Sequence, residues 1–361
     1  MRCSGVAVII ERLQIGAFRN ISSARLEPEP GLNRLIGVNG AGKTSVLEAI
    51  HFLASGRSFR RGSTSSLRAN GDGEAVLFAR VGDGSGHTLG ARLGAEGREL
   101  RLNGERASGF AAFAEVLKTI HYTPEGHRLA SGGPRERRRF LDWGLFHVEP
   151  SYLELARRYH RALQQRNRWL KTGMPAPDPW GEQLASMGEE IQRRREAYAE
   201  GLEIRAQDVF TELGGFGELR MRLDKGWPEA ATLAEALERD NRREPDTTRV
   251  GPHRGDLQLV LDGAPARERA SRGQQKVIIL ALRLAQLVLA KEESGDVPVF
   301  LFDDVGSELD PERRRAGMDL LERYGRQVFV TSTEEALCPL PSPELPAATF
   351  RVHGGNIERS D

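Results

Sequence analysis

Cysteine is scarce in this chain of 361 residues, which has only Cys3 and Cys338 at its opposite ends. Two cysteines so far apart provide neither a disulfide framework nor the closely spaced ligands of a structural zinc site. This scarcity is typical of proteins from a reducing compartment. We therefore expect a cytoplasmic protein without structural disulfides.

Long apolar runs and an excess of charge are also missing. The sequence has no run of eighteen apolar residues and no secretory signal at its amino terminus, so we expect no membrane partner. The 52 Lys and Arg residues nearly balance the 51 Asp and Glu residues, for a net charge of +1. Any attraction for nucleic acid must therefore be local. A length of 361 residues with 39% hydrophobic content predicts about two domains with real cores.

Lysine is rare too, with six residues among the 52 basic ones, and one of the six lies in the stretch GVNGAGKT. In the pattern G-x-x-x-x-G-K-[ST], backbone N–H groups surround phosphate oxygens, the lysine reaches the terminal phosphates and the hydroxyl binds Mg²⁺. A compact ammonium suits this loop better than a planar guanidinium, which explains a lysine at position 43 of an Arg-rich chain. The pattern predicts that ATP is bound by Gly37, Asn39, Gly40, Ala41, Gly42, Lys43, Thr44 and Ser45.

The context of this loop supports the same prediction. Residues 32–36 are expected to form a short strand, and Val46, Leu47, Ile50 and Leu53 recur at helical spacing. The alternative is a Gly-rich turn with an incidental lysine. A strand before the loop and a helix after it favour the phosphate-binding interpretation.

Three regions of the chain differ in character, and together they predict an α/β fold. Residues 1–123 contain the phosphate loop and a series of short alternating segments, the last followed by Asn103-Gly104, which predicts an antiparallel β subdomain. Residues 124–245 are rich in long polar helical segments and are expected to form an inserted helical lobe. Strand character returns in residues 246–361, which we expect to complete the domain that the first region begins.

An apolar run, VFLF, ends in the two carboxylates Asp303 and Asp304. This is typical of a buried parallel strand whose carboxyl end meets the phosphates. Asp303 is expected to bind Mg²⁺ with Thr44, directly or through water, and Asp304 to orient or deprotonate the attacking water. The expected catalytic residues are therefore Lys43 and Asp304. The alternative is a pair of surface acids after a strand.

Between the loop and this strand, Ser271-Arg272-Gly273-Gln274 opens a long apolar helix. A serine at a helix amino terminus, followed by glycine, presents a hydroxyl and free N–H groups to an anion. The alternative is an ordinary helix cap. The order of the motifs, with an S-x-L-D element at residues 307–310 after the two acids, favours the anion site.

This order resembles that of the ATP-binding-cassette ATPases and, within them, the RecF family of bacterial recombination-mediator ATPases over essentially the whole chain. Further segments that carry the resemblance are LQIGAFRN (13–20), GRSFR (56–60), PRERRRFLD (134–142) and GPHR (251–254). The resemblance implies an ABC-type P-loop ATPase head with an antiparallel β subdomain and an inserted helical lobe. It implies that signature residues of one protomer cover the γ-phosphate bound by the other, and that a D-loop follows the acids. In this chain these residues are Ser271, Gly273 and Gln274 for the signature and Ser307 and Asp310 for the D-loop.

The resemblance also implies a function. It is that of a DNA-binding clamp, active in DNA repair, replication, recombination and the SOS response, that dimerises on ATP with Mg²⁺ as cofactor. Such a clamp binds single-stranded or gapped duplex DNA and promotes loading of the recombinase RecA with RecO- and RecR-type mediators. A transporter-type ATPase subunit and a structural chromosome-associated head are the alternatives.

Two departures from the superfamily predict slow hydrolysis. The usual switch histidine is absent, and the strand at residues 328–330 leads instead into Thr331, Ser332 and Thr333. The catalytic acid is Asp304 rather than the longer glutamate of transporters, so it is expected to hold water less closely. We therefore expect ATP to act mainly as a clamp.

A local excess of positive charge gives the neutral chain a candidate DNA surface. Residues 135–171 contain ten Lys and Arg against four Asp and Glu. Arg157, Arg161 and Arg168 recur at near-helical spacing, and such a stripe can neutralise phosphates. The alternative is a solvated helix face. We expect these three arginines to contact DNA.

Overall fold

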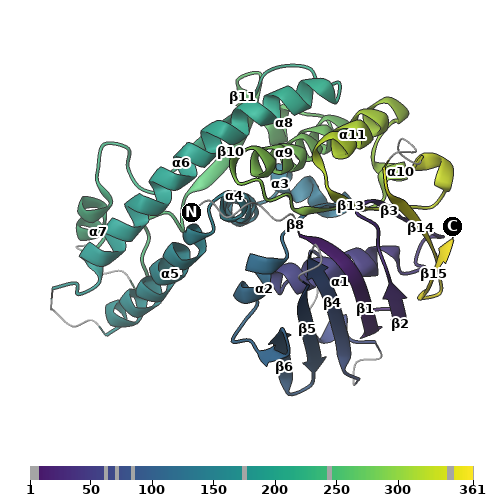
Figure 1. Cartoon of the computed structure of the whole chain (residues 1–361). Helices are drawn as coiled ribbons and strands as arrows, with labels where there is room; N and C mark the ends of the chain where they lie inside the picture. Colours follow the sequence, from purple (N-terminus) through teal and green to yellow (C-terminus); the bar gives the residue numbers. More distant parts are fainter. Residues whose placement is uncertain are drawn as a thin grey trace. The chain divides into compact units, whose positions relative to one another are not determined.

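A computed structural model describes residues 8–60, 64–69, 73–82, 86–172, 177–241, 246–339 and 345–360. The residues group into two compact units (Figure 1). Unit 1 comprises Met1–Gly126, Glu212–Gly214 and Ile279–Asp361, and unit 2 comprises His127–Thr211 and Gly215–Ile278.

The first sheet of unit 1 has six strands, five of which run parallel. Two adjacent strands of this sheet, Val299–Phe302 and Gln327–Ser332, are buried at every position, as the apolar runs in their sequences predict. Parallel strands bring their carboxyl ends to one edge, where ligands of such sheets bind. In spatial order the strands are β15 (Asn356–Ser360), β14 (Ala347–His353), β3 (Gly31–Ile36), β13 (Gln327–Ser332), β12 (Val299–Phe302) and β8 (Thr119–Tyr122).

The second sheet of unit 1 is the predicted antiparallel meander, extended by two strands from the amino terminus. Asn103 and Gly104 both have positive φ, 53° and 83°, as the predicted two-residue hairpin turn requires. The strand order is β2 (Ile21–Leu26), β1 (Ile9–Phe18), β4 (Ala75–Gly82), β5 (His87–Gly94), β6 (Gly97–Leu102) and β7 (Glu105–Arg106).

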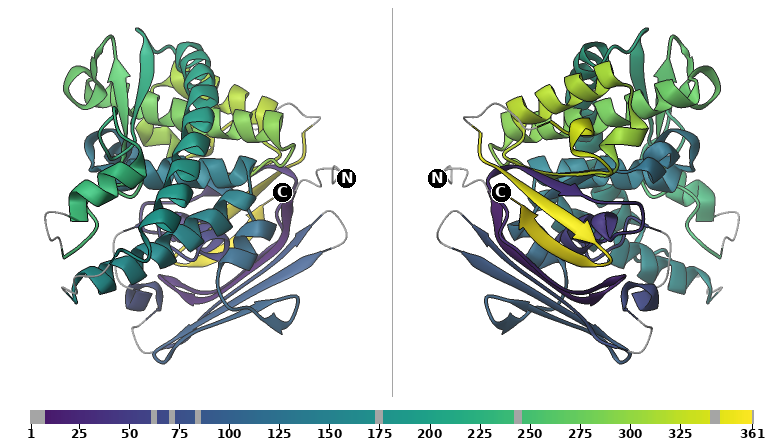
Figure 2. Two further views of the ribbon diagram at one scale, coloured as in Figure 1. Left: turned by 90° about the vertical axis from the view of Figure 1, so that its left-hand side faces the viewer. Right: turned by 90° about the vertical axis from the view of Figure 1, so that its right-hand side faces the viewer.

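Helix α1 (Lys43–Ser55) packs against strands of both sheets, and one hydrophobic core includes side chains from all three (Figure 2). Eleven of its thirteen residues are buried, so the helix after the phosphate loop is held on every side. The other elements that lie wholly in the described part of unit 1 are η1 (Thr64–Leu67), α2 (Ala111–Val116), α10 (Val305–Glu308), α11 (Pro311–Tyr324) and η3 (Glu335–Leu337).

Unit 2 contains helices and a small sheet. Its elements are α3 (Arg128–Ser131), α4 (Pro134–Val148), α5 (Ser151–Leu170), α7 (Leu233–Asn241), α8 (Ala266–Arg269), β9 (Leu219–Asp224), β10 (Asp256–Leu261) and β11 (Ala264–Pro265). Three more elements cross the unit boundaries, namely η2 (Pro124–His127), α6 (Gly181–Glu212) and α9 (Arg272–Glu293).

The strand β9 was not expected in a region predicted to be helical. Its sequence, LRMRLD, alternates apolar and charged residues, and its leucines pair with those of β10, in the register Leu257 with Leu223 and Leu261 with Leu219. This pairing groups residues 246–278 with unit 2, whereas the predicted division places them with the carboxyl-terminal part of the head. The predicted domain boundaries thus differ from the packing units and stay a prediction.

Helix α9 is long and apolar enough to meet a length-and-composition criterion for a membrane span. However, 72% of its most apolar stretch is buried inside the fold. A core helix meets the same criterion, and the burial of α9 matches that of a core helix.

Candidate nucleotide site

The phosphate loop connects the carboxyl end of β3 to the amino end of α1 in unit 1. Gly40 and Gly42 have φ of +79° and +119°, a region that glycine adopts without steric cost. No side chain caps the first turn of α1. The amino end of the helix is therefore left as a site for an anion.

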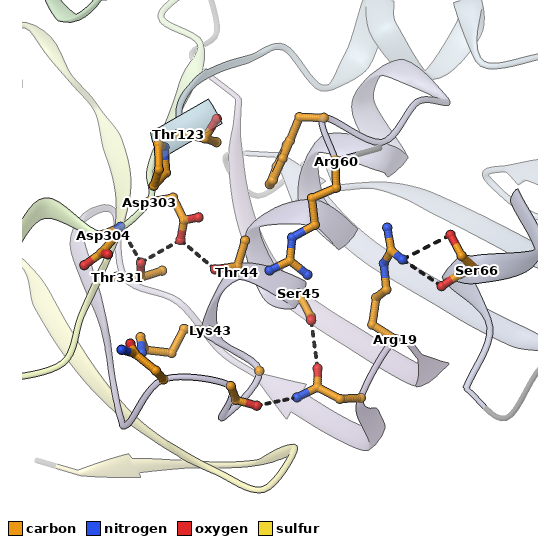
Figure 3. A pocket seen from close by; sticks show the side chains of 16 residues that line it. Arg19, Lys43, Thr44, Ser45, Arg60, Ser66, Thr123, Asp303, Asp304 and Thr331 are labelled. Carbon is orange, nitrogen blue, oxygen red and sulfur yellow. Dashed lines mark hydrogen bonds between the residues drawn. The ribbon is translucent and has the colours of Figure 1, made fainter. Parts of the chain in front are cut away.

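A cavity of about 660 Å³ opens over this loop (Figure 3). Its size lies within the range of small-molecule sites. Most of the predicted loop residues line it, together with both aspartates after β12. The lining residues are Arg19, Asn20, Asn39, Gly40, Gly42, Lys43, Thr44, Ser45, Phe59, Arg60, Ser66, Thr123, Pro124, Asp303, Asp304 and Thr331.

The Lys43 ammonium is held by the loop itself. Its Nζ donates to the carbonyl oxygens of Gly37 at 2.6 Å and Val38 at 3.0 Å. Burial lowers the pKa of Lys43 from its ordinary value, and the nearby carboxylates of Asp304 and Asp303 oppose this effect. The loop thus presents a positive charge beside two negative ones at the cavity wall.

Asp303 and Thr44 lie together, although 259 residues separate them in sequence. Asp303 Oδ1 accepts one hydrogen bond from Thr44 Oγ1 and one from Thr331 Oγ1, both at 2.8 Å. Burial raises the pKa of Asp303, and the two hydroxyl hydrogen bonds oppose the shift. A carboxylate whose charged form is disfavoured by burial is well suited to receive a cation, because a bound cation offsets that cost.

The oxygen atoms of Asp303 and Thr44 are suitable ligands for Mg²⁺. A carboxylate and a hydroxyl are hard oxygen ligands, and Mg²⁺ is usually bound through one or two protein groups plus substrate phosphates. Within the part of the chain that the structure describes, no cluster of three or more His, Cys, Asp or Glu side chains forms a separate metal site. A metal here would therefore depend on Thr44, Asp303 and a bound nucleotide.

Asp304 has an unusual backbone conformation, with φ 55° and ψ 54°. Its N–H donates to Thr331 Oγ1 at 2.8 Å, and its carboxylate accepts a hydrogen bond from Ser307 Oγ. Thr331, at the position where the switch histidine is absent, therefore links the two aspartates. Asp310, the other predicted D-loop residue, caps α11 by accepting from Arg313 N at 3.0 Å.

The predicted signature lies in unit 2, at the start of α9. Ser271 Oγ accepts from Gln274 N at 3.2 Å, and Gln274 Oε1 accepts from Ser271 N at 2.9 Å. This reciprocal pair is a capping box, so Ser271 does act as a helix cap. Ser271 and Gly273 are exposed. Contact of the signature with a nucleotide on a second protomer stays a prediction.

Two arginines of the cavity wall were not predicted as site residues. Arg19 donates through Nη2 and Nε to the fully buried carboxylate of Glu48, at 2.6 and 2.9 Å. Arg60 lies 3.8 Å from the same carboxylate and points into the cavity in Figure 3. Both occur in segments that carry the family resemblance, but their spacing alone indicates no role.

The three arginines predicted to contact DNA lie on α5 in unit 2. Arg157, Arg161 and Arg168 are all exposed, and we call them the α5 basic face. Arg161 pairs with Glu154 at 3.0 Å on the surface. Neighbouring Arg166 is instead fully buried, so the local excess of positive charge divides between surface and core.

Comparison with known proteins gives consistent matches. Residues 9–340 match the family model described as RecF/RecN/SMC N terminal domain. A relative named DNA replication and repair protein RecF, from Stenotrophomonas maltophilia, is 41% identical over 90% of this chain and 93% of its own length. One with the same name from Thioalkalivibrio sulfidiphilus is 38% identical over 98% of this chain and 100% of its own.

Solved structures match equally broadly. The recombination mediator protein RecF-ATP in the RecFOR pathway superposes with a TM-score of 0.84 at 26% identity, over the full length of both chains. An Smc head domain from Pyrococcus furiosus, bound to the C-terminal domain of ScpA, has a TM-score of 0.60 at 16% identity and covers 98% of this chain and 96% of its own, so it shares the fold alone. The predicted fold, a mixed α/β ATPase head of this type, is confirmed.

Proposed function

This chain belongs to the RecF family, and on that premise we propose that it is an ATP-dependent DNA-binding clamp of DNA repair and replication. One observation carries the ATP part of the proposal. Thr44 of the phosphate loop and Asp303 of a distant strand are hydrogen bonded at 2.8 Å at the wall of a 660 Å³ cavity. That arrangement suits a nucleotide bound with Mg²⁺.

The residues of the site divide the chemistry between them. When ATP binds, the Lys43 ammonium would leave the carbonyl oxygens of the loop and contact the terminal phosphates. Thr44 and Asp303 would hold Mg²⁺, which would neutralise phosphate charge. Asp304 orients the attacking water, with its backbone N–H fixed by Thr331. Because an aspartate reaches less far than a glutamate and no switch histidine is present, we expect slow hydrolysis to ADP and phosphate.

The active form in this proposal is an ATP-dependent homodimer. Ser271, Gly273 and Gln274 of one copy cover the γ-phosphate held by Lys43 of the other. The exposure of Ser271 and Gly273 at the start of a 22-residue helix supports this role, because free N–H groups at a helix amino end attract anions.

The DNA part of the proposal rests on family membership and on the α5 basic face. The matched relatives are named for DNA replication and repair, and the solved structures for the RecFOR pathway. We infer a cytoplasmic protein that binds single-stranded or gapped DNA and promotes RecA loading and the SOS response with RecO- and RecR-type mediators. A structural head that binds ATP without needing turnover is the alternative.

Light scattering of the wild type and three variants tests the clamp, with and without ATP and gapped duplex. Asp304→Asn is expected to form a stable ATP-dependent dimer that retains DNA, because ATP is bound but hydrolysed more slowly. Lys43→Met and Ser271→Arg are expected to stay monomeric, since they disable opposite halves of one composite site. If every variant and the wild type stay monomeric with ATP and DNA, the proposed dimer is wrong.

The same variants separate the clamp from the structural head. Repair of gapped DNA in cells that carry Asp304→Asn is expected to fail if turnover is required. Normal repair with this variant would favour the structural alternative.

A further inference from the structure

The carboxyl-terminal hairpin of unit 1 reaches the phosphate loop. Strand β14 runs parallel to β3, the strand that leads into the loop, and β15 returns from it (Figure 2, yellow). The hairpin turn consists of Gly354 and Gly355, with φ of 54° and 84°, between the paired residues His353 and Asn356. A two-residue turn of this kind is tight, so the tip of the hairpin is well defined.

Backbone atoms of this hairpin touch the loop directly. The N–H of Gly355 donates to the carbonyl oxygen of Ala41 at 2.9 Å. A Cβ atom at Gly355 would lie 2.2 Å from the carbonyl oxygen of Asn20, and one at Gly37 would lie 2.1 Å from that of Val352. Neither glycine has room for a side chain, which makes this a close contact between backbones.

Asn20 supports the loop beside the same contact. Its Nδ2 donates to the carbonyl oxygen of Gly40 at 2.9 Å, and its Oδ1 accepts from Ser45 Oγ at 2.8 Å. Together with the bond from Gly355 to Ala41, three hydrogen bonds secure the loop. All three use carbonyl or hydroxyl groups of the loop, so none of them uses a loop N–H group that a phosphate needs.

We propose that Gly355, acting together with Asn20, is a positioning residue of the phosphate loop. Through this residue the hairpin of β14 and β15 sets the affinity of the loop for ATP. This inference rests on the proposed ATP function. Gly355 does not line the cavity, and its effect must therefore pass through the loop. A loop that binds phosphate through backbone donors depends on their placement to within about 0.5 Å.

Replacing Gly355 with alanine tests the proposal in the full chain. We expect Gly355→Ala to weaken the affinity for a fluorescent ATP analogue with Mg²⁺ by at least about tenfold, because the added Cβ displaces the turn or the backbone at Asn20. Gly354→Ala is the matched control. It also has positive φ, but an added Cβ meets nothing within 4 Å, so its affinity is expected to match the wild type.

Two more variants separate positioning from stability. Gly355→Asn keeps the clash but relieves some strain, because asparagine tolerates a left-handed backbone, and it is expected to weaken binding as alanine does. Thr349→Val removes from β14 the acceptor of two buried hydrogen bonds, which Arg34 Nε and Nη2 donate at 3.0 and 2.6 Å. Because a buried guanidinium loses its partner, this variant is expected to lower the nucleotide-free unfolding midpoint while leaving ATP affinity unchanged, whereas a merely structural role of the hairpin predicts that both fall together.

The outcomes are distinct. If the wild type binds ATP and the folded Gly355 variants bind it equally well, the inference is wrong and the proposed function stands. If neither Gly355 variant folds, Asn20→Ala decides. Weaker ATP binding by this variant supports the inference that hydrogen bonds from outside the loop position it, and unchanged ATP binding overturns that inference. If the wild type binds no better than Lys43→Met, the proposed function fails and this inference fails with it.

Discussion

Charged side chains of the same types serve different purposes in the two units. Around the phosphate loop of unit 1, Lys43, Asp304 and Arg60 line an open cavity where a ligand can meet them. In unit 2, Arg166 and Arg195 are buried and lie against aspartates of the same unit. Lys43 is itself buried, so access to an open cavity, rather than residue type or burial alone, separates a candidate binding charge from a structural one.

The buried group in unit 2 accounts for two of the motifs that carry the family resemblance. Arg195 donates through Nε and Nη2 to Asp142, at 2.8 and 2.9 Å, and through Nη1 to the carbonyl oxygen of Pro252 at 2.7 Å. Arg137 binds both carboxylate oxygens of Asp256 at 2.8 Å. Arg195 of α6 thereby joins the segments 134–142 and 251–254, and Arg137 joins the first segment to β10, so both arginines hold unit 2 together.

The largest expected effect is on stability. Arg195→Ala removes the buried guanidinium from Asp142, whose carboxylate is 35% exposed and keeps the 2.6 Å hydrogen bond from Tyr152. Breaking a buried pair typically costs about 3 to 5 kcal/mol of unfolding free energy, and we expect a loss near the lower end of this range. Urea denaturation followed by circular dichroism measures the loss. Arg161→Ala, which removes an exposed pair on α5, is the control and is expected to change stability little. Equal losses in the two variants would contradict the comparison.

An intermediate effect is expected on the pH dependence of stability. Burial lowers the pKa of His253 to about 4, although its hydrogen bond to the Thr248 carbonyl opposes the shift. His253 takes up a proton near pH 6.5 in the unfolded chain but only near pH 4 in the folded chain. The contribution of neutral His253 to the unfolding free energy is therefore present above pH 6.5 and is lost as the pH falls from 6.5 to 4. The loss amounts to about 3 kcal/mol.

His253→Gln removes this titration. We expect urea unfolding of the wild type to weaken more steeply between pH 6.5 and 4 than that of the variant. Parallel pH curves for the two proteins would show that His253 is protonated equally in the folded and unfolded states. That result would show that burial does not hold His253 in its neutral form in the folded protein.

The smallest effect is expected at the α5 basic face. Replacing Arg157, Arg161 and Arg168 one at a time with glutamine should reduce the salt dependence of DNA affinity by about one unit of log–log slope for each phosphate that the variant no longer neutralises. Fluorescence anisotropy with single-stranded DNA at several salt concentrations measures this slope. Arg220→Gln, at another exposed arginine of unit 2, is the control. Unchanged slopes would show that this face is only solvated.

Local patterns were enough to predict several parts of this protein. The strand before Gly37, the helix that begins at Lys43 and the buried strand before Asp303 occur where the sequence places them, because hydrophobic period and glycine placement act over a few residues. The resemblance extended this local information to the α/β ATPase head. The strand β9 was missed because alternating arginines hid its apolar face.

Tertiary structure decided everything that joins distant segments. Only the folded chain brings Thr44 to Asp303, Arg19 to Glu48 and Gly355 to Ala41, and only packing buries Arg166 while it leaves Arg168 exposed. A single sequence records the periods of its helices and strands, but not which strand ends share an edge of a sheet. The motifs were thus determined by the sequence itself, while their meeting at one cavity depends on the order of strands in the sheet.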